Sequence, residues 1–223
     1  MAGLCWMVVA VAFSLSIGNS MAVGLDRLTQ IMKEIKNRYF IPNMQFSLAA
    51  NIPVDQNQLK NAFNADDPDV VEDTVKSGEV YEGTNVVEAT FKRVELPGRV
   101  YTDHAEYRVL EKIHDLATRS EGNILIFYSY LSPCGAKCAS KTHPYSILKK
   151  LKDTIDGAKW NDRAFVFSKV FDGKTIDEKD IKGSLENLGE SVGQNNTFRC
   201  YTSNKRCIKC FIDGKLAAEC FKN

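Results

Sequence analysis

A histidine, a glutamate and two cysteines in a set order place the strongest constraint on how this chain can fold. His104 and Glu106, separated by one residue, are followed much later by Pro133, Cys134 and Cys138. One imidazole and two thiolates are three zinc ligands, and they leave a tetrahedral ion one position open for water, as in catalytic sites. Glu106, two residues from a ligand, can take a proton from that water and pass it on. The fold must therefore bring both segments to one point.

The residues around each half of this pattern predict that both lie at the start of a helix. Ser132 is a suitable N-cap and Pro133 a suitable first residue, so Cys134 and Cys138 would share one helix face. Asp103 can cap a second helix. Apolar residues of that helix recur at helical spacing: Val109, Leu110, Ile113, Leu116 and Ala117. The positive ends of two helix dipoles would then favour thiolate over thiol.

Other interpretations of the same residues remain open. The stretch from Asp103 to Glu106 also fits a capping box, in which the glutamate reaches back to the Asp103 backbone. Cys134 and Cys138 could form a small disulfide or be buried thiols. Either half of the pattern alone proves little, but both halves in this order are rarely found by chance. We therefore predict a zinc site with His104, Cys134 and Cys138 as its ligands.

Apolar spacing along the chain predicts alternating strands and helices, the pattern of an α/β fold. The expected elements are a helix over 25–40, a strand over 44–52, strand material over 79–94 with a turn at 97–98, a buried strand over 123–128, a helix after the cysteines that His143-Pro144 interrupts, a buried strand over 163–170, a helix over 176–188 and a strand from 197. The last three imply a parallel pair of strands. Residues 53–78 are polar and predict an inserted loop with one short helix and a solvated acidic run at 66–69.

The N-terminal segment predicts export. Residues 1–22 carry no charged side chain, and the mostly apolar stretch 4–17 has the length of a signal-peptide core but is too short to span a membrane comfortably. Small residues at 20 and 22 fit a cleavage site; a signal anchor is the alternative. We predict a signal peptide over 1–22, one domain over 23–223 and no membrane contact after cleavage. A sequon at Asn195 predicts glycosylation and agrees with export.

Four cysteines near the C-terminus predict a disulfide-stapled region of hairpins over 197–223. The four are Cys200, Cys207, Cys210 and Cys220. A turn at 203–204 would set the first pair directly across two strands, and a turn at 213–214 would form a hairpin near the second pair. We predict the disulfides Cys200–Cys207 and Cys210–Cys220, with the other pairings and a four-thiolate zinc site as alternatives.

The metal pattern resembles the signature of zinc-dependent deaminases, His-x-Glu followed by Pro-Cys-x-x-Cys. The second cysteine comes one place late here, a spacing that the AID/APOBEC-like branch tolerates. The segment from Tyr128 to Cys134 is also similar to the Ser-Trp-Ser-Pro-Cys strand end of that branch, with the tryptophan replaced and one residue added. Together with the secretory N-terminus, these residues make the chain resemble the secreted AID/APOBEC-like deaminases of vertebrates.

This resemblance implies both a fold and a reaction. The fold would be α/β and cytidine-deaminase-like, with three layers and a mixed five-stranded sheet flanked by helices. A helical crossover between the last two strands goes with the polynucleotide-acting branch, and its absence with free-nucleoside deaminases. The reaction would be zinc-dependent hydrolysis of cytosine to uracil, with Glu106 moving a proton to ring N3. The Ala105 backbone N–H would meet the base carbonyl, and the Ser132 backbone carbonyl the exocyclic amine.

Side chains that would hold the rest of a nucleotide follow less directly from the resemblance. Lys169 and Phe171 occupy the place of a family loop, so Phe171 could stack on a base and Lys169 meet a phosphate. A core position for Phe171 fits equally well. The family also holds the sugar with an asparagine shortly before the histidine, whereas the nearest one upstream here is Asn85. Sugar recognition by the family pattern is therefore in doubt.

Three functions fit these features. The first is a secreted deaminase acting on single-stranded DNA or RNA; the residues do not exclude adenine as the base. The second is a catalytically inactive secreted binding protein that keeps zinc and disulfides for stability. The third is a free nucleoside or nucleotide deaminase, which the expected crossover helix disfavours. Glu106 favours an enzyme, because a purely structural zinc has no use for it. The net charge of +1 does not discriminate.

Overall fold

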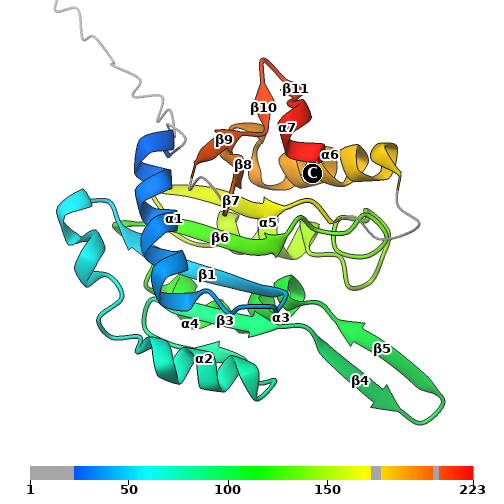
Figure 1. The fold of residues 1–223 in the computed structure, drawn as a ribbon, viewed down its shortest axis with the longest axis horizontal. Coiled ribbons are helices and arrows are strands. Elements are labelled where there is room, and N and C mark those ends of the chain that lie inside the picture. Colours follow the sequence, from blue (N-terminus) through cyan, green and yellow to red (C-terminus); the bar gives the residue numbers. More distant parts are fainter. Residues whose placement is uncertain (1–22, 172–176, 203–205, 223) are drawn as a thin grey trace, which may run out of the picture.

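The computed structural model describes residues 23–171, 177–202 and 206–222, so the predicted signal peptide and the predicted turn at 203–204 lie outside the described residues. At its centre is a seven-stranded mixed sheet in the order β2-β3-β1-β6-β7-β8-β9 (Figure 1). The strands are β1 (Phe46–Pro53), β2 (Tyr81–Glu82), β3 (Val86–Thr90), β6 (Asn123–Leu131), β7 (Asp162–Lys169), β8 (Thr197–Cys200) and β9 (Cys207–Lys209). The mixed sheet is confirmed. Its five predicted strands are the longer central ones, and the short β2 and β9 extend both edges.

The sheet contains a parallel part and an antiparallel part. β6, β7 and β8 run parallel, whereas β1, β3 and β9 are antiparallel to their neighbours. β7 connects to β8 through α6 (Glu178–Val192), so the predicted crossover is confirmed. β6 lies in the middle of the sheet with both faces covered, which explains its nearly unbroken apolar sequence.

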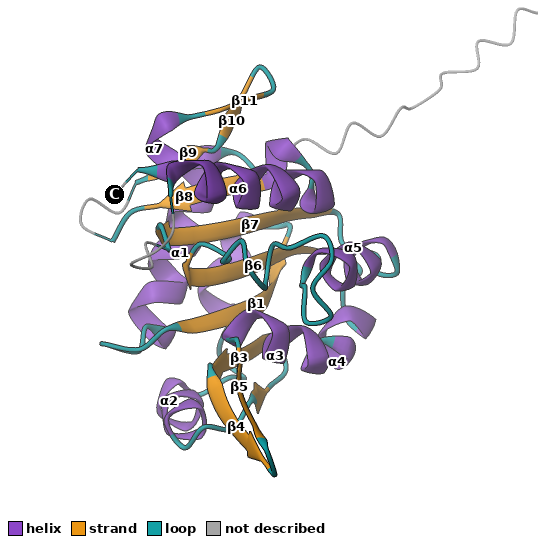
Figure 2. Ribbon diagram, turned by 90° about the vertical axis from the view of Figure 1, so that its right-hand side faces the viewer, coloured by secondary structure: helices purple, strands orange, loops and turns teal. Residues whose placement is uncertain are grey.

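Helices cover both faces of the sheet and complete the three layers. One face packs against α1 (Leu25–Tyr39) and α2 (Pro68–Lys76). The other packs against α3 (Ala105–Lys112), α4 (His114–Thr118), α5 (Leu148–Asp156), α6 and the short α7 (Ala218–Phe221), and Figure 2 shows α3 to α6 over that face. The helix predicted as one unit after His104 is thus two helices that meet at Ile113. Among the described residues, no helix combines the length and apolarity that a bilayer span needs.

The inserted segment before β2 is more ordered than the sequence predicts. It forms a 3₁₀ helix, η1 (Gln56–Asn61), as well as α2. Asp66, predicted to be solvated, is fully buried. Its carboxylate accepts hydrogen bonds from the backbone N–H groups of Thr84, at 2.8 Å, and Asn85, at 2.9 Å, and from the Tyr81 hydroxyl, at 3.1 Å. These three donors pair the buried oxygens and fasten the insertion to the β2–β3 turn.

A second buried carboxyl, that of Glu88, has no such partners. Glu88 lies on β3 two residues from Val86, so it shares the sheet face that α1 and α2 cover. Neither of its oxygens has a hydrogen-bond partner among the described residues. Burial, and secondarily the nearby Glu72, raise the pKa of this carboxyl well above its usual value. Burial therefore favours the protonated form of Glu88 in the folded protein.

We expect Glu88→Met to stabilise the protein, increasingly so as pH rises. Above the usual glutamate pKa the unfolded chain loses this proton while the folded chain keeps it, so folded stability falls with pH. The variant removes this cost, and its free energy of unfolding should exceed that of the wild type by about 1–3 kcal/mol at pH 8. Urea unfolding at pH 5 and pH 8 measures the effect, since the gain should shrink at pH 5. A pH-independent loss of stability would contradict the assignment.

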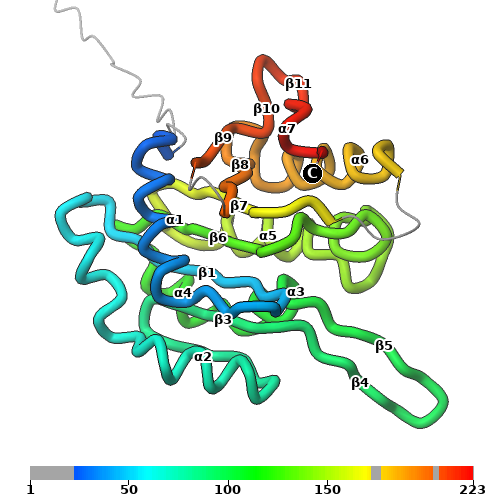
Figure 3. Tube along the Cα trace, viewed as in Figure 1, coloured from blue at the N-terminus to red at the C-terminus, as the bar shows by residue number. Residues whose placement is uncertain are grey.

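A separate two-stranded hairpin projects from the molecule just before α3. β4 (Lys92–Leu96) pairs antiparallel with β5 (Arg99–Asp103), and both leave the main sheet (Figure 3). Gly98, with φ 75°, allows the tight connection. The predicted turn at 97–98 is present, but it closes a hairpin instead of turning the chain directly into the His104 helix.

Both predicted disulfides are confirmed. Cys200 and Cys207 lie directly opposite each other on β8 and β9 and are bonded. The second bridge, Cys210–Cys220, joins α7 to the start of the hairpin β10 (Phe211–Ile212) and β11 (Lys215–Leu216). The four-thiolate zinc site is therefore wrong, because all four sulfurs are used in bridges.

Candidate active site

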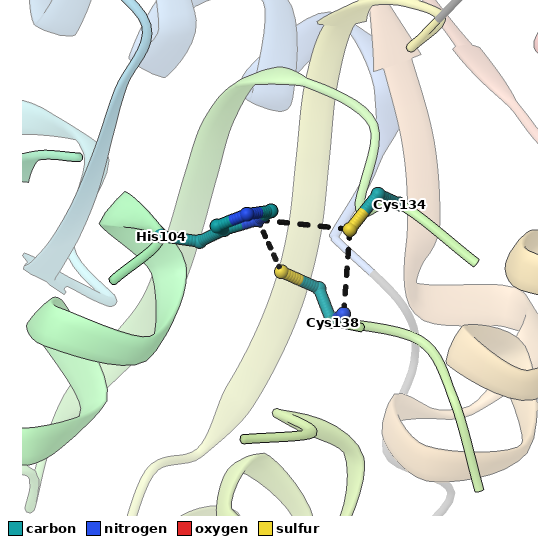
Figure 4. A group of neighbouring side chains, drawn as sticks. All are labelled: His104, Cys134 and Cys138. Carbon is teal, nitrogen blue, oxygen red and sulfur yellow. Dashed lines mark hydrogen bonds between the residues drawn. The ribbon is translucent and has the colours of Figure 1, made fainter. Parts of the chain in front are cut away.

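His104, Cys134 and Cys138 meet at one end of the strands. His104 is the N-cap residue of α3, and both cysteines lie in the loop after β6. The imidazole Nδ1 is 3.1 Å from the Cys138 sulfur and 3.6 Å from the Cys134 sulfur (Figure 4). All three ligand atoms lie within 4.8 Å of one another. The two cysteines are not joined to each other, so the small-disulfide alternative is wrong.

The three ligand atoms fit a tetrahedral ion. With Zn–N near 2.1 Å and Zn–S near 2.3 Å, the ligand atoms of such a site stand about 3.6 Å apart. The separations around Nδ1, 3.1 and 3.6 Å, are close to this. One nitrogen and two sulfur ligands also leave a fourth position for water or substrate. The cluster could therefore hold a metal ion with one open position.

Hydrogen bonding lowers the pKa of one of the two cysteine thiols. Hydrogen bonds from Cys138 and His104 lower the pKa of Cys134 to about 4, against the opposing effect of burial. The same contact with Cys134 raises the pKa of His104 and that of Cys138. The lowered pKa favours the thiolate form of Cys134, which is the form that binds a metal, and metal binding would displace the protons on its neighbours.

The loop that carries the cysteines is not the predicted helix. Residues 135–139 form turns, and the next helix, α5, begins only at Leu148. The reason is tertiary contact with α6: the Asn187 amide donates to the Ala139 carbonyl at 2.9 Å, and a Cβ on Gly135 would lie 2.6 Å from the Ser184 hydroxyl. Pro144 further disfavours helix at the residue before it. Cys134 and Cys138 are therefore brought together by turns, without a helix dipole behind them.

The predicted cap of α3 is also wrong. Asp103 ends β5, and His104 takes the N-cap position without a side-chain hydrogen bond. The Glu106 side chain is hydrogen-bonded to Ser129 and not to the Asp103 backbone: its Oε1 accepts a 3.0 Å hydrogen bond from the Ser129 hydroxyl. Its Oε2 lies 3.9 Å from the Cys138 sulfur. The capping-box alternative therefore fails, and the carboxylate lies against the metal-ligand cluster.

Burial sets the acidity of Glu106. The residue is 3% exposed, in the first turn of α3. Burial raises the pKa of the carboxyl, while its own backbone N–H, His104 and the Ser129 hydroxyl partly offset this. A carboxyl whose pKa lies above the usual value is closer to the pKa that proton transfer at neutral pH requires. Glu106 is thus suited to accept a proton and to release it.

A hydrogen-bond network that the sequence did not reveal fixes the orientation of Glu106. The Ser129 hydroxyl donates to Glu106 and accepts from Ser47, at 3.1 Å, and from the Gln45 amide, at 3.2 Å. The side-chain amide oxygen of Gln45 accepts a hydrogen bond in turn from the Leu131 backbone N–H, at 3.0 Å. The Ser129 hydroxyl thus uses its single donor and both of its acceptor lone pairs in hydrogen bonds. These bonds fix the orientation of the hydroxyl. The signal in the sequence is a polar residue within each of two buried strands, and only the pairing of Ser47 with Ser129 across β1 and β6 joins them.

A pocket of about 220 Å³ opens beside the cluster. Its lining residues are Gln45, Phe91, Thr102, His104, Ala105, Glu106, Leu131, Ser132, Cys134 and Phe171. Ala105, Ser132 and Phe171 therefore all line the pocket, and their contacts with a substrate stay predictions. Phe171 is half-buried at the pocket, and its backbone N–H donates to the Ser132 hydroxyl at 2.9 Å, so it is not simply a core residue.

Other predicted residues lie outside this pocket. The Lys169 ammonium lies over the Tyr130 ring, 5.5 Å from its centroid, and does not line the pocket. Asn85 is structural: its amide donates to the Ala62 carbonyl at 2.7 Å, away from the cluster. The carboxamide that lines the pocket is that of Gln45, which sequence analysis missed. Asn195 is exposed in η2 (Gln194–Asn196), and its glycosylation stays a prediction.

Comparison with known protein families gives a match over nearly the whole chain. A family model described as Secreted Novel AID/APOBEC-like Deaminase 1 matches residues 25–223. The matched range includes the sheet, the ligand cluster and both disulfides. No curated protein and no solved structure matches the chain significantly.

Proposed function

The chain belongs to the family of secreted AID/APOBEC-like deaminases, and from this premise we propose that it hydrolyses cytosine to uracil in single-stranded DNA or RNA. The observation that carries the proposal is the position of Glu106. This buried carboxylate lies beside three metal-ligand atoms and lines a 220 Å³ pocket. A site built only to stabilise the fold would not need a proton acceptor there.

Zinc is the cofactor that we propose for the cluster, with His104, Cys134 and Cys138 as its ligands. Imidazole nitrogen and thiolate sulfur are the ligands that zinc prefers in proteins. When bound, zinc supplies a water nucleophile at neutral pH. The thiolate character of Cys134 and the tetrahedral spacing of the ligand atoms support this choice.

The protein groups then carry the proton transfer and hold the base. Glu106 takes a proton from water as the water oxygen bonds to C4, and delivers it to ring N3. Glu106 then carries the second proton from the oxygen now bonded to C4 to the amine. The C4–N bond breaks as the C4=O bond forms, so cytosine and water become uracil and ammonia. The Ala105 backbone N–H donates to the base carbonyl, and the Ser132 backbone carbonyl accepts from the exocyclic amine. Phe171 stacks on the base, and Lys169 meets a phosphate outside the pocket.

Processing of the chain belongs to the same proposal. We propose that residues 1–22 are a signal peptide, that residues 23–223 form one deaminase domain, and that Asn195 is glycosylated. The family is described as secreted. Two disulfides in the C-terminal region suit an oxidising compartment.

The proposed function is tested by measuring the conversion of cytosine to uracil in three substrates. Purified exported protein with a measured zinc content is incubated with single-stranded DNA, single-stranded RNA and free cytidine, and uracil or uridine is scored by mass spectrometry. Conversion of a polymer supports the proposal and chooses between DNA and RNA. Conversion of cytidine alone indicates a nucleoside deaminase. No conversion by protein that holds one zinc indicates a binding protein.

We expect Ser129→Ala to lower kcat by about 10- to 100-fold without changing KM or zinc content. The substitution removes the hydroxyl that orients Glu106 but no group that contacts the base. Steady-state kinetics and metal analysis measure the effect. Ser168→Ala is the matched control, because this buried β7 hydroxyl bonds instead to Tyr128 and to the Cys200 carbonyl. Equal kcat in the wild type and Ser129→Ala would show that the network does not position Glu106.

A further inference from the structure

The β4–β5 hairpin forms one wall of the pocket and continues beyond it. Phe91, just before β4, and Thr102, near the end of β5, both line the pocket. Beyond them the hairpin projects into solvent (Figure 1), and its apolar residues Leu96 and Val100 are 51% and 58% exposed there. A ligand larger than one base would therefore meet the hairpin on leaving the pocket.

Aromatic rings from three separate segments meet at the hairpin, outside the pocket lining. Tyr101 of β5 stacks on Tyr145 of the loop after Cys138, with ring centroids 5.7 Å apart and an interplanar angle of 27°. Tyr145 in turn packs edge-on against Tyr107 of α3, at 5.3 Å. None of the three rings is fully buried. Since aromatic rings are usually placed in the core, a partly open stack beside a pocket requires an explanation.

Two cations accompany these rings. The Arg99 guanidinium lies 4.9 Å from the Tyr101 centroid, and the Lys137 ammonium lies 4.9 Å from the Tyr145 centroid. Lys137 also donates to the Thr102 carbonyl, which ties the cysteine loop to the hairpin. In the described part of the chain, no ion pair involves Arg99 or Lys137. Their charges are therefore free for an anionic ligand.

We propose that Arg99, Tyr101, Lys137 and Tyr145, here named the hairpin surface, bind the nucleotides that flank the target base of a single-stranded nucleic acid. Alternating aromatic rings and unpaired cations are the chemistry that such strands require, because rings and guanidinium planes stack on bases while cations meet phosphates. The surface adjoins the pocket through Thr102. The net charge of +1 does not oppose this, because Arg99 and Lys137 act locally on a strand that lies beside them.

The inference rests on the proposed function but is tested without requiring catalysis. Glu106→Gln protein is titrated with a fluorescein-labelled single-stranded oligonucleotide, and anisotropy gives Kd at several salt concentrations. We expect Tyr101→Ala, added to this protein, to weaken binding about ten-fold by loss of stacking. Arg99→Ala should weaken binding and also reduce the slope of log Kd against log salt by about 0.7, the value for one phosphate contact on a single strand.

Tyr201→Ala is the matched control, because this tyrosine also lies under an arginine, Arg199, at 4.6 Å, but directly follows β8 and is not part of the hairpin. It should bind the oligonucleotide like the parent protein. Circular dichroism and thermal melting test for misfolding, and Arg99→Ala is a second variant that removes an exposed side chain while keeping all three rings. Unchanged affinity and salt slope in both Tyr101→Ala and Arg99→Ala would overturn the proposal. Absence of oligonucleotide binding by a protein that converts cytidine would overturn it too, while leaving deaminase activity established.

Discussion

Glu106→Gln should reduce cytosine-to-uracil conversion by about 10²–10⁴-fold, the usual contribution of a general acid–base group. Glutamine has nearly the same size, and its carbonyl oxygen can still accept the Ser129 hydrogen bond. It cannot take a proton from water, so the chemical step loses its acceptor while the fold and the ligand cluster remain. We therefore expect an unchanged melting temperature and one zinc per chain together with the loss of activity.

Mass-spectrometric scoring of uracil, with zinc content measured on the same preparation, decides this prediction. Glu111→Gln provides the matched control, because Glu111 lies on the same helix but is exposed and pairs with Lys150. The control should convert cytosine at the wild-type rate. If Glu106→Gln retained wild-type activity, the proton transfer would belong to another group and the proposed mechanism would be wrong.

Cys138→Ser should remove the metal and much of the stability. The cysteine is fully buried, and its loop contacts the start of α3 through His104 and α6 through Asn187. Because bound zinc stabilises only the folded state, its loss lowers the free energy of unfolding. A loss of about 3 kcal/mol corresponds to a fall in melting temperature of about 6–12 °C for a domain of this size.

Zinc stoichiometry and thermal melting with and without a chelator test this expectation. The chelator should lower the melting temperature of the wild type but leave that of Cys138→Ser unchanged, since the variant has no metal to lose. The disulfides are intact in both proteins, so the comparison isolates the cluster. A variant that kept one zinc per chain would exclude Cys138 as a ligand.

Much of the architecture follows from local sequence patterns. The 3.6-residue spacing of Leu28, Ile31, Met32 and Ile35 predicts α1, and the unbroken apolar run of β6 predicts a central strand. The turn at 213–214 adopts positive φ at both residues, as the aspartate-glycine pair predicts. Such patterns work because side-chain periodicity and turn geometry depend on residues that are close in sequence.

The remaining features depend on contacts between distant segments. The turns around Cys134 replace the predicted helix because α6 packs against them, and Asp66 is buried because the β2–β3 turn supplies its donors. Gln45 reaches the pocket only through the pairing of β1 with β6. Local propensity cannot show these outcomes, because the partners lie far away in the chain.

By itself, the sequence determined which residues form the candidate metal cluster, most of the strand and helix order and both disulfides. In each case the chemistry or geometry is contained in residue types at short spacing. Only the tertiary structure decided how Glu106 is oriented, which side chains enclose the pocket and where the hairpin surface lies. These depend on the packing of elements from opposite ends of the chain, whose hydrogen bonds and ring contacts form only once the sheet has set their distances.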